Sequence, residues 1–260
     1  MTSDPNSPSP APGQPRQLNL QELAGQFMAG VQRHFDNLCF NLAARESATE
    51  SAYDARAKAA TLMPAGQFHQ NFEQMQAYSR DLLLRQVIGD ALNLAVAALH
   101  NAHFFLALVR INATNPVVSP EAQKEAQALQ QAFVRAPLDQ KFNQLEQHYG
   151  VLCELEDTVT SLGFLVQVLL RQGGVVRAEQ LDDNGELSLE LQTAGEGGPS
   201  GAGGLSDLEV RTRVFREGDK VTFEDVELQL TFVTVAVFAH QLFASVARFA
   251  RETGGPSGHH

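Results

Sequence analysis

The sequence predicts a mainly α protein: a helical bundle with a small antiparallel β-hairpin inserted before the C-terminal helix. Through most of the 260 residues, apolar side chains recur at steps of three and four, which places them on one face of an α-helix. After Gly174 the spacing changes to alternation, which is typical of half-buried strands, and from Leu228 the helical spacing returns. We therefore expect a disordered leader at 1–17, one bundle domain at 18–252 with a β insertion at about 185–223, and a flexible tail at 253–260.

The chain is acidic, and this limits the classes of partner that it is expected to bind. Its formal net charge is −11, from 19 Lys and Arg against 30 Asp and Glu. Nucleic-acid binding needs a basic surface, because phosphate neutralisation supplies most of its affinity. The densest basic stretch, Arg211 to Arg216, holds three arginines, so we expect no nucleic-acid partner. The first residues, MTSDPNSPSPAPGQPRQ, lack the basic start and apolar run of a signal peptide, so we expect a cytoplasmic protein.

The N-terminal half predicts two long helices. Apolar spacing from Leu20 to Leu42 predicts the first over 18–45, and a break follows around Met63 and Pro64. No proline interrupts the next segment, 67–111. A straight helix of that length would run about 68 Å, whereas a compact domain of this size is roughly 45–50 Å across. We therefore expect a bend or a break, with Gly89 the natural place.

Part of the second long helix, VIGDALNLAVAALHNAHFFLALVRI, is apolar nearly all round. A membrane span is the alternative to a buried core helix here. Asp90, Asn93, His100, Asn101 and His103 lie inside the stretch, and a charged residue at the centre of a bilayer costs about 3 kcal/mol. The polar residues favour the central helix of a soluble bundle, with no membrane contact.

Three shorter helices should follow. Ser119 to Glu121 supplies an N-cap, a first-turn proline and an acidic residue, and the helix that they open should end near Arg135. The segment PLDQKFNQLEQHYG predicts the second helix, which stops at Gly150. Apolar spacing over 152–171 predicts the third, capped by the pair Gly173-Gly174.

Alternation then predicts two strands. They carry Leu187, Leu189 and Leu191 in the first, and Leu208, Val210, Thr212 and Val214 in the second. The loop from Ala194 to Ser206 has six glycines in thirteen residues, and we expect it to be mobile and dispensable. Val221 to Phe223 is a candidate for a short third strand, and Thr222 with Asp225 resembles a capping box. A near-heptad stripe from Leu228 to Phe249 predicts the last helix.

Few residues suggest chemistry. His100 and His103 lie three residues apart on one helix, but the Glu-x-x-His pairs of di-metal bundles are absent, so packed or hydrogen-bonded histidines are favoured over a metal site. We expect neither a metal nor another cofactor. Cys39 and Cys153 lie in apolar helical contexts that are typical of buried free thiols, although a disulfide stays open. No Ser/His/Asp order, thiol–histidine motif or nucleophile elbow occurs.

Three segments together resemble the HEPN-like bacterial helical family. They are the long helix FHQNFEQMQAYSRDLLLRQVIGDALNLAVAALHNAHFFLAL, the segment PLDQKFNQLEQHYG, and the run SLGFLVQVLLRQGGVV that leads into the hairpin. The resemblance covers about Phe68 to Phe215 and rests on segment order. It implies a homodimer of helical bundles. In many members it also implies a metal-independent ribonuclease site, formed by an Arg, often followed by Asn, and a His four to six residues further on.

This chain departs from that ribonuclease motif. Val166, Gln167 and Arg171 stand where the arginine, asparagine and histidine belong. Valine cannot stabilise the negative charge on the oxygens of a phosphorane, and arginine stays protonated at all accessible pH values, so it cannot act as a general base. The resemblance therefore implies the fold of the family without its activity.

Two functions remain in competition. We favour a non-catalytic interaction and dimerisation module of HEPN-like type, a homodimer that could also bind another protein. The alternative is a metal-independent ribonuclease, toxin-like or related to stress or defence, with an unconventional site around Arg171, His100 or His103.

The dimer prediction rests on adjacent apolar residues. Neighbours on a helix point about 100° apart, so an apolar pair implies burial on two sides. A monomeric bundle does not readily enclose so many faces, although the hairpin could cover one of them within a single chain. The interface candidates are Phe104, Phe105, Phe232, Val233 and Phe238.

Overall fold

Helices dominate the computed structural model, which describes residues 19–58, 71–114, 120–194 and 208–254. The helices are α1 (Leu20–Glu46), α2 (Glu50–Ala57), α3 (Phe72–Thr114), α4 (Pro120–Arg135), α5 (Leu138–Tyr149), α6 (Glu156–Arg171) and α7 (Asp225–Gly254), with a 3-10 turn at Ala178–Gln180. The strands β1 (Leu187–Ala194) and β2 (Leu208–Phe215) form one antiparallel hairpin between α6 and α7. The predicted mainly α bundle with a hairpin insertion is confirmed. The leader, the break at Met63 and Pro64, Ser119, most of the 194–206 loop and the end of the tail lie outside the described residues.

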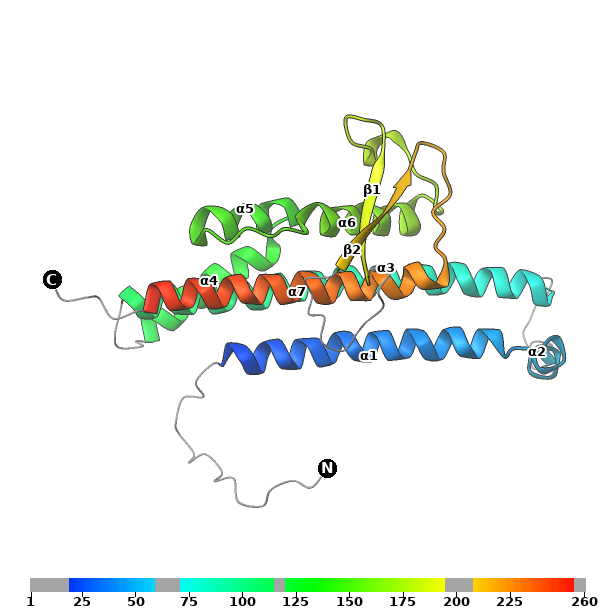
Figure 1. Ribbon diagram of the computed structural model, residues 1–260, viewed down its shortest axis with the longest axis horizontal. Coiled ribbons are helices and arrows are strands. Elements are labelled where there is room, and N and C mark those ends of the chain that lie inside the picture. The colour runs from blue at the N-terminus through cyan, green and yellow to red at the C-terminus, as the bar shows by residue number, and fades with distance from the viewer. Residues whose placement is uncertain (1–18, 59–70, 115–119, 195–207, 255–260) are drawn as a thin grey trace, which may run out of the picture.

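The three long helices α1, α3 and α7 run side by side along the longest dimension of the molecule (Figure 1). Helix α7 packs against both α3 and α1, and α5 and α6 lie on the side of α7 opposite to α1 (Figure 1). Aromatic pairs mark both contacts: Phe243 of α7 meets Phe27 of α1 at 5.7 Å between ring centroids, and Phe238 meets Phe142 of α5 at 6.4 Å. Helix α7 therefore lies between α1 on one side and α5 and α6 on the other (Figure 1).

Helix α3 is one continuous helix of 43 residues, so the expected break at Gly89 was wrong. The limit of roughly 45–50 Å applies to a nearly spherical domain, whereas this bundle is elongated and has room for an unbroken helix of about 65 Å (Figure 1). Packing also holds the helix at its middle, since Ile88 and Ala91 on either side of Gly89 are fully buried. Buried alanines at steps of four, three and four (Ala91, Ala95, Ala98 and Ala102) let neighbouring helices approach closely.

The joint between α5 and α6 shows why the third short helix begins later than predicted. Gly150 adopts φ 64°, and the N–H groups of Gly150 and Val151 donate to the carbonyls of Glu146 and Leu145. This is the glycine C-cap that reverses the chain at a helix end. The turn consumes the next residues, so α6 begins at Glu156 rather than at residue 152. At its other end Gly173 and Gly174 have φ 64° and 83°, as the cap prediction requires.

The hairpin has the predicted strands, but β2 presents the face opposite to the one expected. Leu189 pairs with Arg213 and Leu191 with Arg211, and directly paired residues share a face of the sheet. The leucines of β1 pack on α6 and α7, so the two arginines of β2 lie on the core side. Its valines lie outside, and Val210 is 53% exposed.

The segment before α7 forms no third strand. Val221 and Phe223 are buried, and Phe223 stacks on Phe215 with centroids 6.1 Å apart. The Val221 N–H donates to the Gly174 carbonyl at 2.8 Å, but the only strand-like pairing there is an isolated bridge between Val175 and Lys220. The residues predicted to form a third strand, Val221 to Phe223, are therefore part of a packed connection between β2 and α7. The cap of α7 also differs from the predicted pair, because the Glu227 carboxylate accepts the Glu224 N–H at 2.8 Å.

Two described helical segments, Phe72–Ile111 and Asp225–Thr253, are long and apolar enough to cross a membrane by length and composition. Buried residues make up 39% and 56% of their most apolar stretches. Core helices of soluble bundles share this property.

Candidate functional site

The two histidines predicted as site candidates lie against α4 and α5. His103 is 3% exposed, its ring stacks on Phe133 with centroids 4.0 Å apart, and its Nδ1 lies 2.7 Å from Oε1 of Gln130. The Gln130 amide nitrogen donates to the His100 carbonyl at 3.1 Å. This orients the Gln130 oxygen toward His103, so Nδ1 of His103 carries the proton. Gln130 thus fixes both histidine positions of α3.

A buried lysine completes this cluster. Lys141 is 3% exposed, and its Nζ donates to the carbonyls of Val134, at 3.0 Å, and Ala136. It also lies 5.4 Å from the centre of the Phe133 ring. Burial lowers the pKa of Lys141 below 10.5. Burial also lowers the pKa values of His100 and His103 below 6.5, and the nearby Lys141 charge adds to this effect. The cluster closes the C-terminal end of α4 and favours uncharged histidines.

The third catalytic candidate is elsewhere. Arg171 is exposed at the last position of α6, where the chain turns toward the hairpin. None of the contacts of the described residues joins Arg171 to His100 or His103. Among all the residues that the structure describes, no three His, Cys, Asp or Glu side chains lie close enough together to bind a metal ion. The candidates for an unconventional ribonuclease site are therefore not brought together.

Both cysteines are free thiols and half-buried. Burial, with the Glu156 charge as a second cause, raises the pKa of Cys153 to about 12, so the thiol is protonated at neutral pH and is a poor nucleophile. The Cys39 sulfur lies 3.5 Å from the side-chain nitrogen of Gln229.

The interface candidates divide into two groups. Phe232 and Phe238 are buried inside the single chain, whereas Phe104, Phe105 and Val233 are half-buried. Adjacent apolar residues on α7 do require burial on two sides, but α1 and α5 supply both sides within one chain. Packing within the single chain therefore explains the burial of Phe238 and of most of the Phe232 side chain without a dimer.

An apolar groove remains between α1 and α7, with a volume of about 170 Å³. We call it the α1/α7 groove. Its lining consists of uncharged residues: Met28, Val31, Gln32, Phe35, Phe232, Val233 and Ala236. Two of the predicted interface residues, Phe232 and Val233, are in this set.

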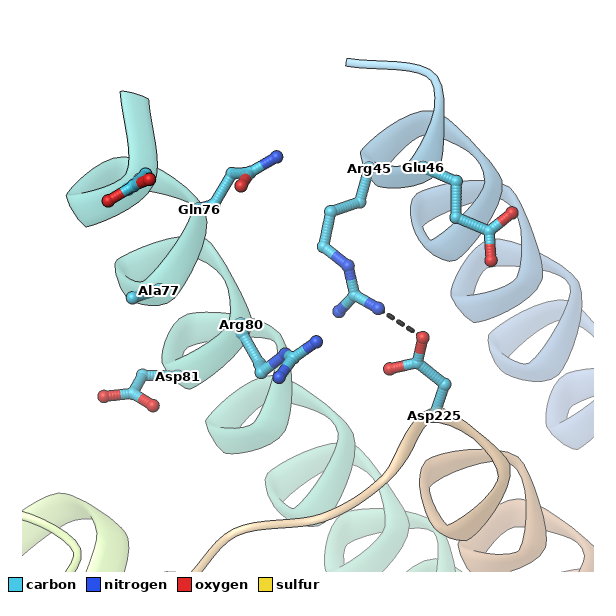
Figure 2. Close-up of a pocket in the computed structure, with 8 residues that line it drawn as sticks. Arg45, Glu46, Gln76, Ala77, Arg80, Asp81 and Asp225 are labelled. Atoms are coloured by element: carbon cyan, nitrogen blue, oxygen red, sulfur yellow. Dashed lines mark hydrogen bonds and ion pairs between the residues drawn. The ribbon is translucent and has the colours of Figure 1, made fainter. Parts of the chain in front are cut away.

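A polar pocket of about 560 Å³ lies where the end of α1 meets the start of α3 and of α7. Arg45 of α1 pairs through Nη2 with Asp225, the first residue of α7, while its Nη1 is buried with no hydrogen-bond partner among the described residues. Arg80 of α3 points toward the same space (Figure 2). We call this the arginine pocket. Arg80 and Asp225 also line a neighbouring cavity of about 520 Å³ next to Arg213.

Sequence reasoning missed the arginine pocket. Arg45 and Asp225 are 180 residues apart in the sequence, and each occupies a position where a charge complements the helix dipole: a cation at the end of α1, an anion at the start of α7. Such residues are ordinary at helix ends, so no local signal marked them.

Comparisons of the chain with protein families, with curated proteins and with solved structures found no match.

Proposed function

We propose that this chain is a non-catalytic helical interaction module of HEPN-like type, which forms a homodimer through the α1/α7 groove. The observation that carries the proposal is an apolar, uncharged groove on the outer face of an otherwise acidic bundle. Met28 and Phe35 of α1 and Val233 of α7 line it and are half-buried. Covering these side chains would remove more apolar surface from water, at roughly 25 cal/mol per Å².

A second copy of the chain is the occupant that the charges favour. Each copy carries a formal charge of −11, so two copies repel each other over most of their surfaces. A two-fold contact places the same patch on both sides, and the patch must therefore contain no like charges that would face each other. The lining of the α1/α7 groove meets this condition. Its one polar residue, Gln32, donates to Asp36 at 2.7 Å.

The proposal places the long apolar helices in a soluble bundle in the cytoplasm. The apolar part of α3 carries Asp90, His100 and His103, and a bilayer disfavours such groups. His34 of α1 lies 3.1 Å from the Asp90 carboxylate, so this polar position serves the contact between two helices of the bundle.

Sedimentation at micromolar concentrations tests the proposal. We expect a species of twice the 28.3 kDa chain mass. Val233→Glu and Met28→Glu, on different helices, should each shift the protein toward monomer, because each places two like charges in the contact. The matched control is Val210→Glu, an exposed valine on β2 that lies outside the groove; it should leave the dimer unchanged.

A monomer at every concentration would overturn the homodimer. A dimer that both groove variants leave intact would move the interface elsewhere on the bundle. The non-catalytic part has its own test, an RNA-cleavage assay of the parent and of Arg171→Ala. Strand scission that Arg171→Ala abolishes would replace the proposal with the ribonuclease alternative.

A further inference from the structure

The arginine pocket contains binding groups that the fold leaves unused. The Arg45 side chain is 15% exposed and has one partner among the described residues, Asp225, which it contacts through Nη2. Its other terminal nitrogen, Nη1, is buried without a hydrogen-bond partner in the described part of the chain. A buried N–H group without an acceptor destabilises the fold, and more so when it is charged. An acceptor in the cavity would therefore be bound favourably once the Arg45 side chain turns this covered nitrogen toward it.

The second unused group is Arg80. It makes no hydrogen bond or ion pair with any residue that the structure describes. Figure 2 shows the guanidinium groups of Arg80 and Arg45 both directed at the space beside Asp225. Two guanidinium cations thus face one carboxylate across a cavity of about 560 Å³. A guanidinium group can bind a carboxylate through two parallel hydrogen bonds. The two guanidinium groups can therefore bind one more carboxylate besides that of Asp225.

The charges in the arginine pocket select among anions. Glu46 and Asp81 also line it, but their carboxylates point away from the space between α1 and α3 (Figure 2). Asp81 is engaged by Lys220 at 3.4 Å. The inner groups, two arginines and Asp225, sum to one positive charge. A single carboxylate makes this set neutral, whereas a phosphate dianion would exceed it and face Asp225.

We propose that the arginine pocket binds a small carboxylate ligand, whose carboxylate bridges Arg45 Nη1 and the Arg80 guanidinium. The cavity is within the roughly 300–1,000 Å³ of typical small-molecule sites. Pairing the ligand with both arginines satisfies the buried Arg45 nitrogen and neutralises Arg80.

A second feature favours a ligand that also carries an ammonium group. Glu73 lines the arginine pocket seven residues before Arg80 on α3, about 10 Å along the helix. It makes no ion pair with the described residues either. A flexible amino acid whose two charged ends are several methylenes apart can reach from Arg80 toward Glu73. The ligand class is therefore an ω-amino acid or a short peptide rather than a simple fatty acid.

Calorimetric titration of the full chain with three matched probes tests this inference. The probes are 6-aminohexanoate, hexanoate, which lacks the ammonium group, and hexylamine, which lacks the carboxylate. We expect saturable binding of 6-aminohexanoate, weaker binding of hexanoate and none of hexylamine. Arg80→Gln should weaken 6-aminohexanoate at least about tenfold, because a charge-assisted hydrogen bond contributes about 1.5–3 kcal/mol. Arg80 is exposed, so this change should not disturb folding.

Two further variants separate the pocket from general charge effects. Arg85→Gln removes an exposed arginine from the same helix, outside the arginine pocket, and should leave binding unchanged. Arg45→Lys keeps a cation beside Asp225 but lacks the second terminal nitrogen, so it should weaken binding while circular dichroism shows the parent fold.

Several results would overturn the inference. Absence of saturable binding for both carboxylate probes would remove the site. Equal affinities of Arg80→Gln and Arg85→Gln would do the same, because they would reduce the effect to net charge. Inorganic phosphate that binds more tightly than hexanoate would replace the carboxylate class with phosphate ligands. Equal binding of hexanoate and 6-aminohexanoate would refute the ammonium contact with Glu73 and leave the carboxylate contact standing.

Discussion

Two buried ionisable groups lie in different parts of this bundle and are stabilised in different ways. Glu227, in the first turn of α7, is fully buried beneath β2, and its Oε1 lies 3.3 Å from Arg211 Nη2 and 3.4 Å from Arg213 Nε. Lys141 of α5 is also buried but has no carboxylate partner among the described residues; it donates to two backbone carbonyls at the end of α4. Glu227 is held by two cations in addition to the backbone N–H of Glu224, whereas Lys141 is held by backbone carbonyls.

The difference shows what each region needs. A carboxylate cannot remain buried at low cost without cations, so the Glu227 position requires both arginines of β2 and fixes the hairpin to α7. The Lys141 ammonium instead donates hydrogen bonds to carbonyls at a helix end, which carry partial negative charge. This ammonium caps α4 and stacks over Phe133. One arrangement fastens two elements together, and the other closes a single helix.

The largest predicted effect comes from removing both cations from Glu227. The double variant Arg211→Gln/Arg213→Gln leaves a buried carboxylate uncompensated, and breaking a buried ion pair in this way costs about 3–5 kcal/mol. Urea unfolding of the variant and the parent measures this difference.

Arg216→Gln is the matched control for the double variant. Arg216 pairs with Glu186 at 2.9 Å on the surface of the same hairpin, and exposed pairs contribute about 0–1 kcal/mol. If the double variant lost no more stability than this control, the arginines would not be what holds Glu227, and the comparison of the two groups would fail.

A smaller effect is expected from Lys141→Met. Methionine fills much of the same volume and avoids the cost of burying an ammonium, but it leaves the carbonyls of Val134 and Ala136 without their donor. These opposing contributions should leave a net loss of about 1–2 kcal/mol at pH 7, measured by urea unfolding. A loss as large as that of the double arginine variant would show that Lys141 is as indispensable as an ion pair, contrary to the comparison.

The sequence predicts the helices and the hairpin more fully than it predicts these buried polar sites. Helical and alternating spacing place the helices and the hairpin, because apolar periodicity is local. The spacing of β2 is ambiguous: Val210 and Val214 alternate with Arg211 and Arg213, so either face can be the inner one. The inner face is the one that carries Arg211, Arg213 and the buried Phe215, and Glu227 lies beneath its two arginines. The contact of Glu227 with the arginines joins a strand to the first turn of a helix, so the periodicity of either element alone could not reveal it.

The Lys141 position was more accessible to sequence reasoning. Leu138, Lys141, Phe142 and Leu145 follow one another at steps of three, one and three, so they lie on the same face of α5. A lysine on an apolar face is a signal of a buried or capping cation. The arginine pocket, in contrast, is assembled from the ends of three helices, and its geometry depends on how those helices pack.

The smallest effect, and the most specific to the Lys141 cluster, is a dependence of stability on pH. Burial lowers the pKa values of His100 and His103 from 6.5 in the folded protein. Below pH 6.5 the unfolded chain binds protons at these positions that the folded chain does not bind. Stability contributed by the neutral histidines is therefore present above pH 6.5 and is lost as the pH falls toward the lowered folded pKa values.

His103→Asn isolates one of the two histidines. The asparagine amide can still donate to Oε1 of Gln130, as His103 Nδ1 does, but it has no proton to gain in this range. The variant should lose some stability at pH 8 from the missing stack on Phe133, and its stability should fall less steeply than that of the parent between pH 6.5 and pH 5. Urea unfolding across this range measures both slopes. Identical slopes would mean that His103 gains its proton as easily in the folded chain as in the unfolded one. Lys141 would then not lie in surroundings of low polarity, and its contrast with Glu227 would fail.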